Sequence, residues 1–518
     1  MYNRRTVLQG AGAVGLGGVL LGGVSWSRAN AAETRAVRAI LPSATHDTLA
    51  VKVLLDTPPS AAPVLTIDGR KIAAQQMDVE GYAWGFVQPD LKGGTSHALT
   101  LADEFGAPLR APWELKTLPG LDERPERFRV LFFTCAGGDE AGSARTVEER
   151  RALFDRALSF APDLAVANGD HIYWDLDTAL KIRGDAESRA RKAELYHQIA
   201  WIDQDTAFDS VTNRNSLNTV IGRQIASIYE DRFASVPLVF ISDDHDYFEN
   251  DNGGTWGYTF PPRPFTLGLQ RRTASIAYPF ALGRPTLPGG ALTSETVETV
   301  RIGKLAELAL FDCRRGWDTV TGKKGVLFPE VEHFLIERLR QSDASQYIQV
   351  PSNPFGWTAG KLGEWYEDQP PAGTKGSDKD FWFPGWFDQH QRLIKALSEQ
   401  HGRPAITISG DMHASGAKRF TSSGDIDLSA NPVEALLAGT VGTGASGWPS
   451  MGRGMFPSTP GKLVGTDIAE TVEKNGFTLF DITHDHVEVR QFSWRPPEPI
   501  EAIASLEPYA TFRIERRA

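Results

Sequence analysis

Six short apolar segments, each followed by polar or charged residues, constrain the fold of this chain more than any other feature of its sequence. They are FRVLFFT before Cys135, DLAVAN before Gly169-Asp170, VPLVFIS before Asp243, LALFD shortly before Arg314, YIQV before Pro351 and AITIS before Gly410-Asp411. Between the first two lies TVEERRALFDRALSF, which opens with a capping box from Thr146 to Glu149 and predicts a helix. Alternating strands and helices predict an α/β fold, in which functional groups collect at the carboxyl ends of the strands.

Three of these strand ends carry side chains that can bind metal ions. They are NGDHIYWD with Asp170 and Tyr173, DDHD with Asp244 and His245, and SGDMHASG with Asp411 and His413. Carboxylate oxygens and imidazole nitrogens suit a divalent or trivalent ion, and one carboxylate can bridge two ions. A metal cluster would also neutralise the carboxylates of residues 243–251, which otherwise repel one another.

A calcium loop of the EF-hand kind does not explain the acidic run. Such a loop needs a carboxylate at position 1 and glycine at position 6. Placing Gly253 at position 6 puts Phe248 at position 1.

The residues before the first of these strands have a different pattern. Residues 35–120 contain short alternating segments, such as DTLAVKVLLD and HALTLAD, separated by turn-forming sequences, which is typical of a small β-sandwich. The polar segment LPGLDERPER then predicts a linker. Residues 126–518 are expected to form the catalytic α/β domain. Near the end, LFDITHDHVEVRQFSW predicts two strands that return to complete a second sheet.

The first residues predict an export signal. Two arginines at 4–5 precede a glycine-rich apolar run at 11–26, and residues 29–31, Ala-Asn-Ala, have the small side chains of a cleavage site. Adjacent arginines before a weakly apolar run resemble a twin-arginine signal, so the twin-arginine export machinery is an expected partner. The run is shorter than the roughly 20 apolar residues of a spanning helix. We expect residues 1–31 to be an export signal of a periplasmic or secreted protein without a stable membrane span; a membrane anchor is the alternative.

Composition excludes several classes of protein. The 518 residues are 41% hydrophobic and 23% charged, which is ordinary for a soluble folded protein. A formal net charge of −11 argues against nucleic-acid binding, which depends on many lysines and arginines. Cys135 and Cys313 are the two cysteines, too few for a disulfide scaffold. A bridge between them is the less favoured alternative, because their local sequences differ.

Taken in order along the chain, five motifs resemble those of the PhoD-like alkaline phosphatases and phosphodiesterases. This family belongs with the purple acid phosphatases to the calcineurin-like metallophosphoesterases. The motifs are a strand ending at Cys135, Gly169-Asp170-x-x-Tyr173, Asp243-Asp244-His245-Asp246, Leu310-Phe311-Asp312-x-Arg314 and Ser409-Gly410-Asp411-x-His413. The resemblance implies an αββα sandwich preceded by a small all-β domain of the immunoglobulin or fibronectin kind.

The resemblance also implies roles for individual residues. Asp170 would bridge two metal ions, and Tyr173 and Cys135 would bind a ferric ion. Asp244 would bind the second metal, and His245 would orient the phosphate ester or protonate it. Asp411 and His413 stand in place of the two histidines of the usual GHxH motif. The implied cofactors are Fe³⁺ with one or two Ca²⁺ ions, or another divalent metal in place of either.

Several residues depart from the family pattern. Cys135 is followed by Ala-Gly-Gly rather than glutamine, Ser242 stands in place of tryptophan, and no histidine matches the middle histidine of the superfamily. Arg314 has two interpretations: a clamp on a phosphate oxygen, since guanidinium matches phosphate geometry, or an ordinary salt bridge. Asp243 and Asp246 could cap, hold water or bind metal. His171 is expected to pack or to support a ligand, and Asp139, Glu140, Asp175 and Asp177 to face solvent.

The expected function is an exported phosphoesterase that hydrolyses phosphate monoesters or diesters by in-line attack of a metal-bound hydroxide. Its substrate would be a small phosphate ester, a nucleotide, a phospholipid or a wall polymer. The alternative is a non-catalytic calcium-binding envelope or extracellular protein on the same fold. Long connections carry Trp256, Trp357, Trp365, Trp382 and Trp386, which could line a cleft but more often pack in a core.

Overall fold

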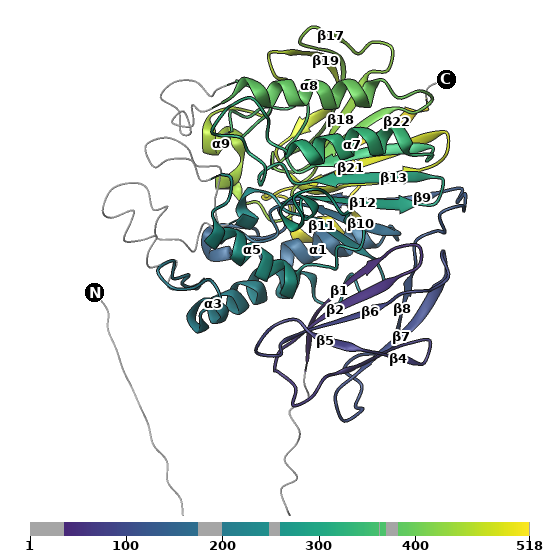
Figure 1. Cartoon of the computed structure of the whole chain (residues 1–518), viewed down its shortest axis with the longest axis vertical. Helices are drawn as coiled ribbons and strands as arrows, with labels where there is room; N and C mark the ends of the chain where they lie inside the picture. The colour runs from purple at the N-terminus through teal and green to yellow at the C-terminus, as the bar shows by residue number, and fades with distance from the viewer. Residues whose placement is uncertain (1–35, 175–198, 248–259, 362, 369–381, 517–518) are drawn as a thin grey trace, which may run out of the picture. The chain divides into compact units, whose positions relative to one another are not determined.

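The computed structural model describes residues 36–174, 199–247, 260–361, 363–368 and 382–516 (Figure 1). The predicted export signal lies outside these residues, as do Asp175, Asp177 and Trp256. Within the described part of the chain, no helix has the length and apolar character needed to cross a membrane.

The first strands form two four-stranded antiparallel sheets, in the orders β1-β2-β6-β5 and β4-β3-β7-β8. Their side chains share one core, in which Val51 and Val53 of β2 lie in the same cluster as Leu99 and Leu101 of β7. The strands are β1 (Val37–Ala44), β2 (Leu49–Leu55), β3 (Val64–Ile67), β4 (Arg70–Ile72), β5 (Ala74–Gln76), β6 (Ala83–Gln88), β7 (Ser96–Ala102) and β8 (Trp113–Lys116). The turn-rich pattern of residues 35–120 thus forms an antiparallel β region.

This β region is not separated from the rest of the described chain. Residues 36–518 form one compact unit, and the Ile40 N–H in β1 donates to the Glu230 carbonyl at 2.8 Å. The boundary between a β-sandwich domain ending at 120 and a catalytic domain beginning at 126 therefore stays a prediction.

Two larger mixed sheets form the main body of the molecule. One has the order β11-β10-β9-β20-β21-β22, and the other contains β12-β13-β14-β15-β18-β16-β17 with β19 paired to β16. The first sheet consists of β9 (Phe128–Phe133), β10 (Leu164–Asn168), β11 (Leu238–Ile241), β20 (Asn475–Ile482), β21 (His486–Trp494) and β22 (Ala510–Glu515). The second consists of β12 (Val297–Ile302), β13 (Ala306–Phe311), β14 (Gln346–Pro351), β15 (Ala405–Ser409), β16 (Ser415–Ser423), β17 (Ile426–Asp427), β18 (Val433–Ala438) and β19 (Leu463–Val472).

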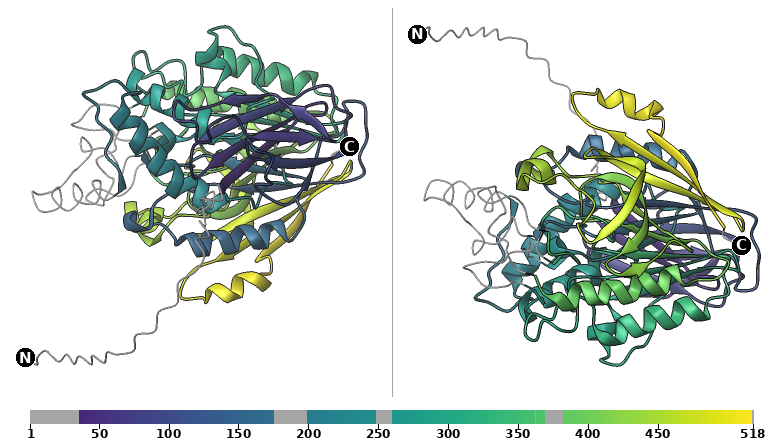
Figure 2. Two further views of the ribbon diagram at one scale, coloured as in Figure 1. Left: turned by 90° about the horizontal axis from the view of Figure 1, so that it is seen from below. Right: turned by 90° about the horizontal axis from the view of Figure 1, so that it is seen from above.

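The two large sheets pack face to face between helices. Val130 and Val166 of the first sheet share a core with Leu308 and Ile348 of the second. Successive side chains of a strand point to opposite faces, so neighbouring residues pack outward: Leu131 against α1, and Tyr347 in one cluster with α7 and α8. Figures 1 and 2 show α7 and α8 along one outer face and α1 along the other. This is the predicted αββα sandwich.

The helices agree with the local signals of the sequence. Thr146 and Glu149 form the predicted capping box at the start of α1. Proline begins α5, α7 and α8, where its missing N–H removes no helical hydrogen bond. The helices are α1 (Val147–Leu158), α3 (Val211–Ile221), α4 (Ser227–Tyr229), α5 (Pro264–Ala277), α6 (Ala291–Ser294), α7 (Pro329–Gln341), α8 (Pro384–Ser398) and α9 (Pro449–Arg453).

The packing decides two alternatives that the sequence left open, the disulfide and the role of the tryptophans, and it shows where the tail strands pair. Cys135 and Cys313 are both buried and free, so no disulfide joins them. The tail strands β20 and β21 were predicted to complete a second sheet; instead they extend the sheet of β9, because β20 pairs antiparallel with β9. Trp357, Trp365 and Trp386 are fully buried and Trp382 is half-buried, so these tryptophans pack in the core.

Candidate metal centre

The carboxyl ends of the parallel strands in both large sheets meet at one edge of the sandwich. The Thr134 N–H after β9 donates to the Gly439 carbonyl after β18 at 2.9 Å. The Asn168 side-chain amide of β10 donates to the Pro351 carbonyl of β14, also at 2.9 Å. These cross-sheet bonds bring the polar strand ends together, as the strand order predicts.

Glycines allow the turns after these strands to approach closely. A Cβ on Gly169, which has a φ of +84°, would lie 2.5 Å from the Asp243 Cβ. A Cβ on Gly410 would lie 2.2 Å from the Asn168 carbonyl oxygen. Both distances are shorter than real Cβ contacts, so the two motifs need glycine at these positions.

Four of the predicted metal ligands have left-handed backbone conformations. The φ angles are 51° at Cys135, 57° at Asp170, 65° at Asp411 and 53° at His413. Such angles are uncommon outside glycine and carry a free-energy cost, and they concentrate at functional sites. Cys135, Asp170 and Asp411 each lie two residues after a strand, and His413 lies in the turn between β15 and β16.

The first cluster centres on Asp170 and contains Cys135, Tyr173 and His413. Asp170 Oδ2 lies 3.1 Å from the Tyr173 hydroxyl, 3.5 Å from Cys135 Sγ and 3.9 Å from His413 Nε2. His413 Nδ1 lies 2.6 Å from the Gly447 carbonyl, so Nδ1 donates there and Nε2 faces the cluster as an acceptor.

The second cluster is acidic and adjoins the first through shared residues. Ligand atoms of Asp170, Asp244 and His245 lie within 4.8 Å of one another, and so do those of Asp243, Asp244 and Asp411. Asp244 and His245 come from the 3-10 helix Asp244–Tyr247, directly after β11. The His245 ring packs on Tyr173 with ring centroids 4.1 Å apart.

Comparison with known proteins shows which solved structures have a similar fold. No family model matches the chain, and no curated protein has a similar sequence. The structure of PhoD is similar with a TM-score of 0.59, at 14% identity, over 92% of this chain and 90% of PhoD. The purple acid phosphatase PPD1 from yellow lupin (Lupinus luteus) seeds is similar with a TM-score of 0.54, at 12% identity, over 92% of this chain and 74% of that enzyme. The chain has the calcineurin-like metallophosphoesterase fold.

In this calcineurin-like fold, the donors of the first cluster fit a metal ion. Ligands about 2.0–2.3 Å from one ion lie roughly 3–4 Å apart, which is the spacing found around Asp170. Asp170 Oδ1 is buried and has no hydrogen-bond partner among the described residues. Burial and the charge of Asp170 raise the pKa of both Cys135 and Tyr173 well above their usual values. A bound cation would reverse this effect and favour thiolate and phenolate.

Arg314 lies beneath the acidic cluster rather than at an open surface. Its side chain is fully buried, and Nε donates to Asp243 Oδ1 at 2.6 Å while Nη2 lies 3.1 Å from Asp411 Oδ2. Burial lowers the pKa of Arg314, but Asp243, Asp244 and Asp411 outweigh it and raise that pKa well above its usual value. This geometry favours the salt-bridge interpretation, and the role as a phosphate clamp stays a prediction.

Lys361 is a member of the centre that the sequence motifs did not reveal. Its ammonium donates to Asp411 Oδ1, and only 3% of its side chain is exposed. Burial raises the pKa of Asp411, but Lys361 and Arg314 outweigh it and leave that pKa below its usual value. Both oxygens of Asp411 therefore already contact a cation, so Asp411 is a poor ligand for a metal ion.

Asp246 links two of the strand-end turns. Its carboxylate accepts the N–H groups of Asp170 at 3.0 Å, His171 at 2.9 Å, Ile172 at 3.2 Å and Asp243 at 2.9 Å, and the hydroxyl of Tyr278 at 2.7 Å. Of the three roles that the sequence left open for Asp246, these hydrogen bonds correspond to capping.

The structure also tests the predicted surroundings of His171, Asp139 and Glu140. His171 packs in the core, stacked on Phe240 with ring centroids 4.0 Å apart. The prediction that Asp139 faces solvent is wrong: Asp139 is buried and pairs with Arg223 Nε at 2.6 Å. Glu140 is exposed, as predicted.

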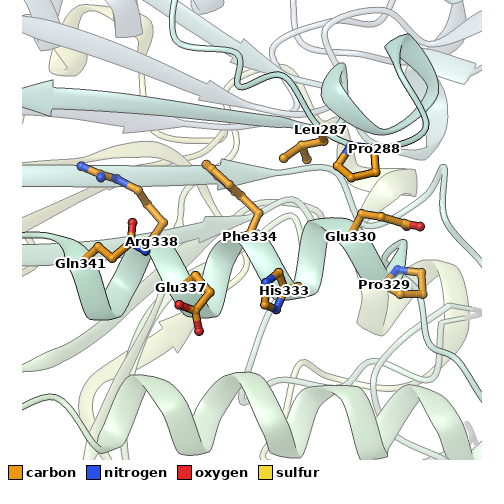
Figure 3. A pocket seen from close by; sticks show the side chains of 9 residues that line it. All are labelled: Leu287, Pro288, Pro329, Glu330, His333, Phe334, Glu337, Arg338 and Gln341. Atoms are coloured by element: carbon orange, nitrogen blue, oxygen red, sulfur yellow. The ribbon is translucent and has the colours of Figure 1, made fainter.

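A surface pocket of about 580 Å³ lies along α7 (Figure 3). Leu287 and Pro288 lie opposite Glu330 and Phe334 of the helix. None of the predicted site residues lines this pocket.

Proposed function

We propose that this chain is a metal-dependent phosphoesterase. The observation that supports this most is the first cluster, in which a thiol, a phenol, a carboxylate and an imidazole converge on one point at the strand ends. PhoD and a purple acid phosphatase share the fold. Monoesters and diesters are both within the proposal, and small esters, nucleotides, phospholipids and wall polymers are the candidate substrates.

The residues present suggest which metal the first cluster holds. A soft thiolate together with hard phenolate and carboxylate oxygens suits a ferric ion, so Cys135, Asp170, Tyr173 and His413 would hold iron. An ion there would lower the pKa of a water molecule and stabilise charge on the phosphate oxygens. The calcium implied by the resemblance would need Asp170, Asp244 and Asp411 as its donors.

The protein side chains would perform the remaining steps. His245 lies beside Asp170 and Asp244 and would donate a proton to the departing ester oxygen. Tyr173 packs against the His245 ring and would hold it in place. Arg314 keeps Asp243 and Asp411 in place from beneath.

Hydrolysis of p-nitrophenyl phosphate and bis(p-nitrophenyl) phosphate by the full chain tests the proposal. We expect turnover that a chelator abolishes, and a loss of at least about 100-fold in Asp170→Asn, which removes the shared carboxylate. Asp425→Asn, at an exposed position, is the matched control and should retain activity. A folded, calcium-stabilised protein that is inert on both esters would instead favour the non-catalytic binding protein.

We also propose export through the twin-arginine route, on the evidence of the arginines at 4–5 and the apolar run after them. Because that route reads the arginine pair, replacing both with lysine should leave the precursor in the cytoplasm. Cell fractionation with an antibody against the chain measures this. Unchanged export of the double-lysine variant would contradict the proposal.

A further inference from the structure

We infer that the Lys361 ammonium, backed by the Arg314 guanidinium, takes the place of a second metal ion at Asp411, so that the chain binds one metal ion in the first cluster. The inference concerns the proposed metal site and rests on the proposed function for its catalytic meaning. The distances, burial and charges from which it is argued do not depend on any reaction.

Asp411 is compensated on both of its oxygens. Lys361 Nζ donates to Oδ1, and Arg314 Nη2 lies 3.1 Å from Oδ2. Asp411 is fully buried, as is Arg314, and Lys361 is 3% exposed. Water therefore screens these contacts little, and the ion pairs are strong.

The neighbouring carboxylates share the same cation. Arg314 Nε donates to Asp243 Oδ1 at 2.6 Å, and Nη2 lies 3.3 Å from Asp243 Oδ2 and 3.8 Å from Asp244 Oδ1. The set Asp243, Asp244 and Asp411 thus has three carboxylates against two fixed cations. Little negative charge remains to attract a divalent ion, and any ion there would be repelled by the ammonium and the guanidinium.

The loop that carries Lys361 is held in place from several sides. Glu364 accepts the Thr358 hydroxyl at 2.6 Å and the Ala359 N–H at 2.8 Å. Thr358 also forms a reciprocal backbone pair with Ser458, with both bonds at 3.0 Å. These contacts hold Thr358 and Ala359, which lie just before Lys361 in the chain.

The first cluster contrasts with this arrangement. Asp170 Oδ2 is surrounded by the side chains of Cys135, Tyr173 and His413, none of them a lysine or arginine. Asp170 Oδ1 has no hydrogen-bond partner among the described residues. At the other end, Asp411 Oδ2 and Asp244 Oδ1 lie 3.1 Å and 3.8 Å from Arg314 Nη2, so a fixed cation already lies beside them.

Metal content of the full chain tests the inference. After saturation with iron and calcium and removal of free metal, elemental analysis should find about one ion per chain in the wild-type protein. Lys361→Met keeps an unbranched side chain, one atom shorter, but removes the charge, so Asp411 gains the capacity to bind a metal. We expect this variant to hold about one additional calcium ion per chain, seen also as a new binding event in calorimetry.

Lys418→Met is the matched control. Lys418 is similarly buried and bonds Asp467 at 2.6 Å, so its replacement should leave the metal count unchanged. Two tightly bound ions in the wild-type protein would overturn the inference, whether or not Lys361→Met folds. A folded Lys361→Met variant that gains no calcium would also overturn it. Hydrolysis is measured separately: one bound ion without esterase activity would contradict the proposed function and leave this inference intact.

Discussion

At the residue scale, one short turn gives four consecutive side chains three different surroundings. After β11, Asp243 accepts from Arg314, Asp244 and His245 lie in the candidate metal clusters, and Asp246 accepts backbone N–H groups. A 3-10 helix turns about 120° per residue, so neighbouring side chains diverge. Asp243 and Asp244 still have carboxylate oxygens within 4.8 Å of each other, and the Arg314 guanidinium beside both offsets their repulsion.

The proposed role of His245 predicts a dependence on the leaving group. A general acid matters most when the departing oxygen is a poor leaving group. We expect His245→Asn to lower hydrolysis of an alkyl phosphate by about 100-fold and that of p-nitrophenyl phosphate by less than about 10-fold. Steady-state kinetics on both esters, at equal metal content, measure this. Equal losses on the two substrates would contradict the role as proton donor.

The sequence predicted the acidic and histidine residues of the centre because they stand directly after apolar strands. It could not predict Lys361, which lies ten residues after β14 in a long connection with no motif of its own. Nor could it predict the burial of Asp139, because the partner, Arg223, lies in a distant segment. Contacts of this kind arise from tertiary packing, and local sequence carries no signal of them.

At the scale of elements, the turns after β10 and β11 form a single unit joined by Asp246. Four backbone N–H groups and one hydroxyl donate to its carboxylate. Burial and the neighbouring Asp170 raise the pKa of Asp246 to about 7, while the donors partly offset this effect. The position of Asp170 therefore depends on a residue that belongs to none of the candidate metal clusters.

Replacing Asp246 should loosen this unit. Asp246→Asn exchanges one acceptor oxygen for a donor that faces backbone N–H groups, so we expect the free energy of unfolding to fall by about 3 kcal/mol. Tyr278→Phe removes only one of the five donors and should lower it by about 1 kcal/mol. Urea unfolding measures both. Equal stabilities of the Asp246→Asn variant and the wild-type protein would contradict the linking role.

At the scale of the whole molecule, the strand segments and the layered fold were predictable because each strand carries its own apolar signal. The pairing partner of the tail strands was less predictable. The predicted strands β20 and β21 form, but β20 pairs with β9, more than 300 residues earlier. Pairing between strands so far apart in the chain depends on tertiary packing, which local sequence does not reveal.

Two buried histidines make the stability of the fold sensitive to acid. Burial lowers the pKa of His171 and of His390 to about 3. In the unfolded chain each histidine binds a proton below about pH 6.5, whereas in the folded chain it does not until about pH 3. Their contribution to stability is therefore complete above pH 6.5 and is lost as the pH falls toward 3.

His390→Gln should reduce this pH dependence. His390 lies in α8 and belongs to none of the candidate metal clusters, and its Nε2 lies 2.9 Å from the Tyr366 hydroxyl. Between pH 6 and pH 4, we expect the free energy of unfolding to fall less steeply in the variant, by about 1.4 kcal/mol per pH unit. Urea unfolding across this range, with exposed His401→Gln as the control, measures the slopes. Parallel slopes for His390→Gln and the wild-type protein would contradict the prediction.

The visible absorption spectrum of the full chain, prepared without chelator and paired with elemental analysis, tests the central claim most directly. If Cys135, Asp170, Tyr173 and His413 hold iron, the protein should contain iron and show a broad band in the visible range. Tyr173→Phe should abolish the band or shift it strongly, because it removes the phenolate. A colourless protein that binds no transition metal would contradict the account of the first cluster.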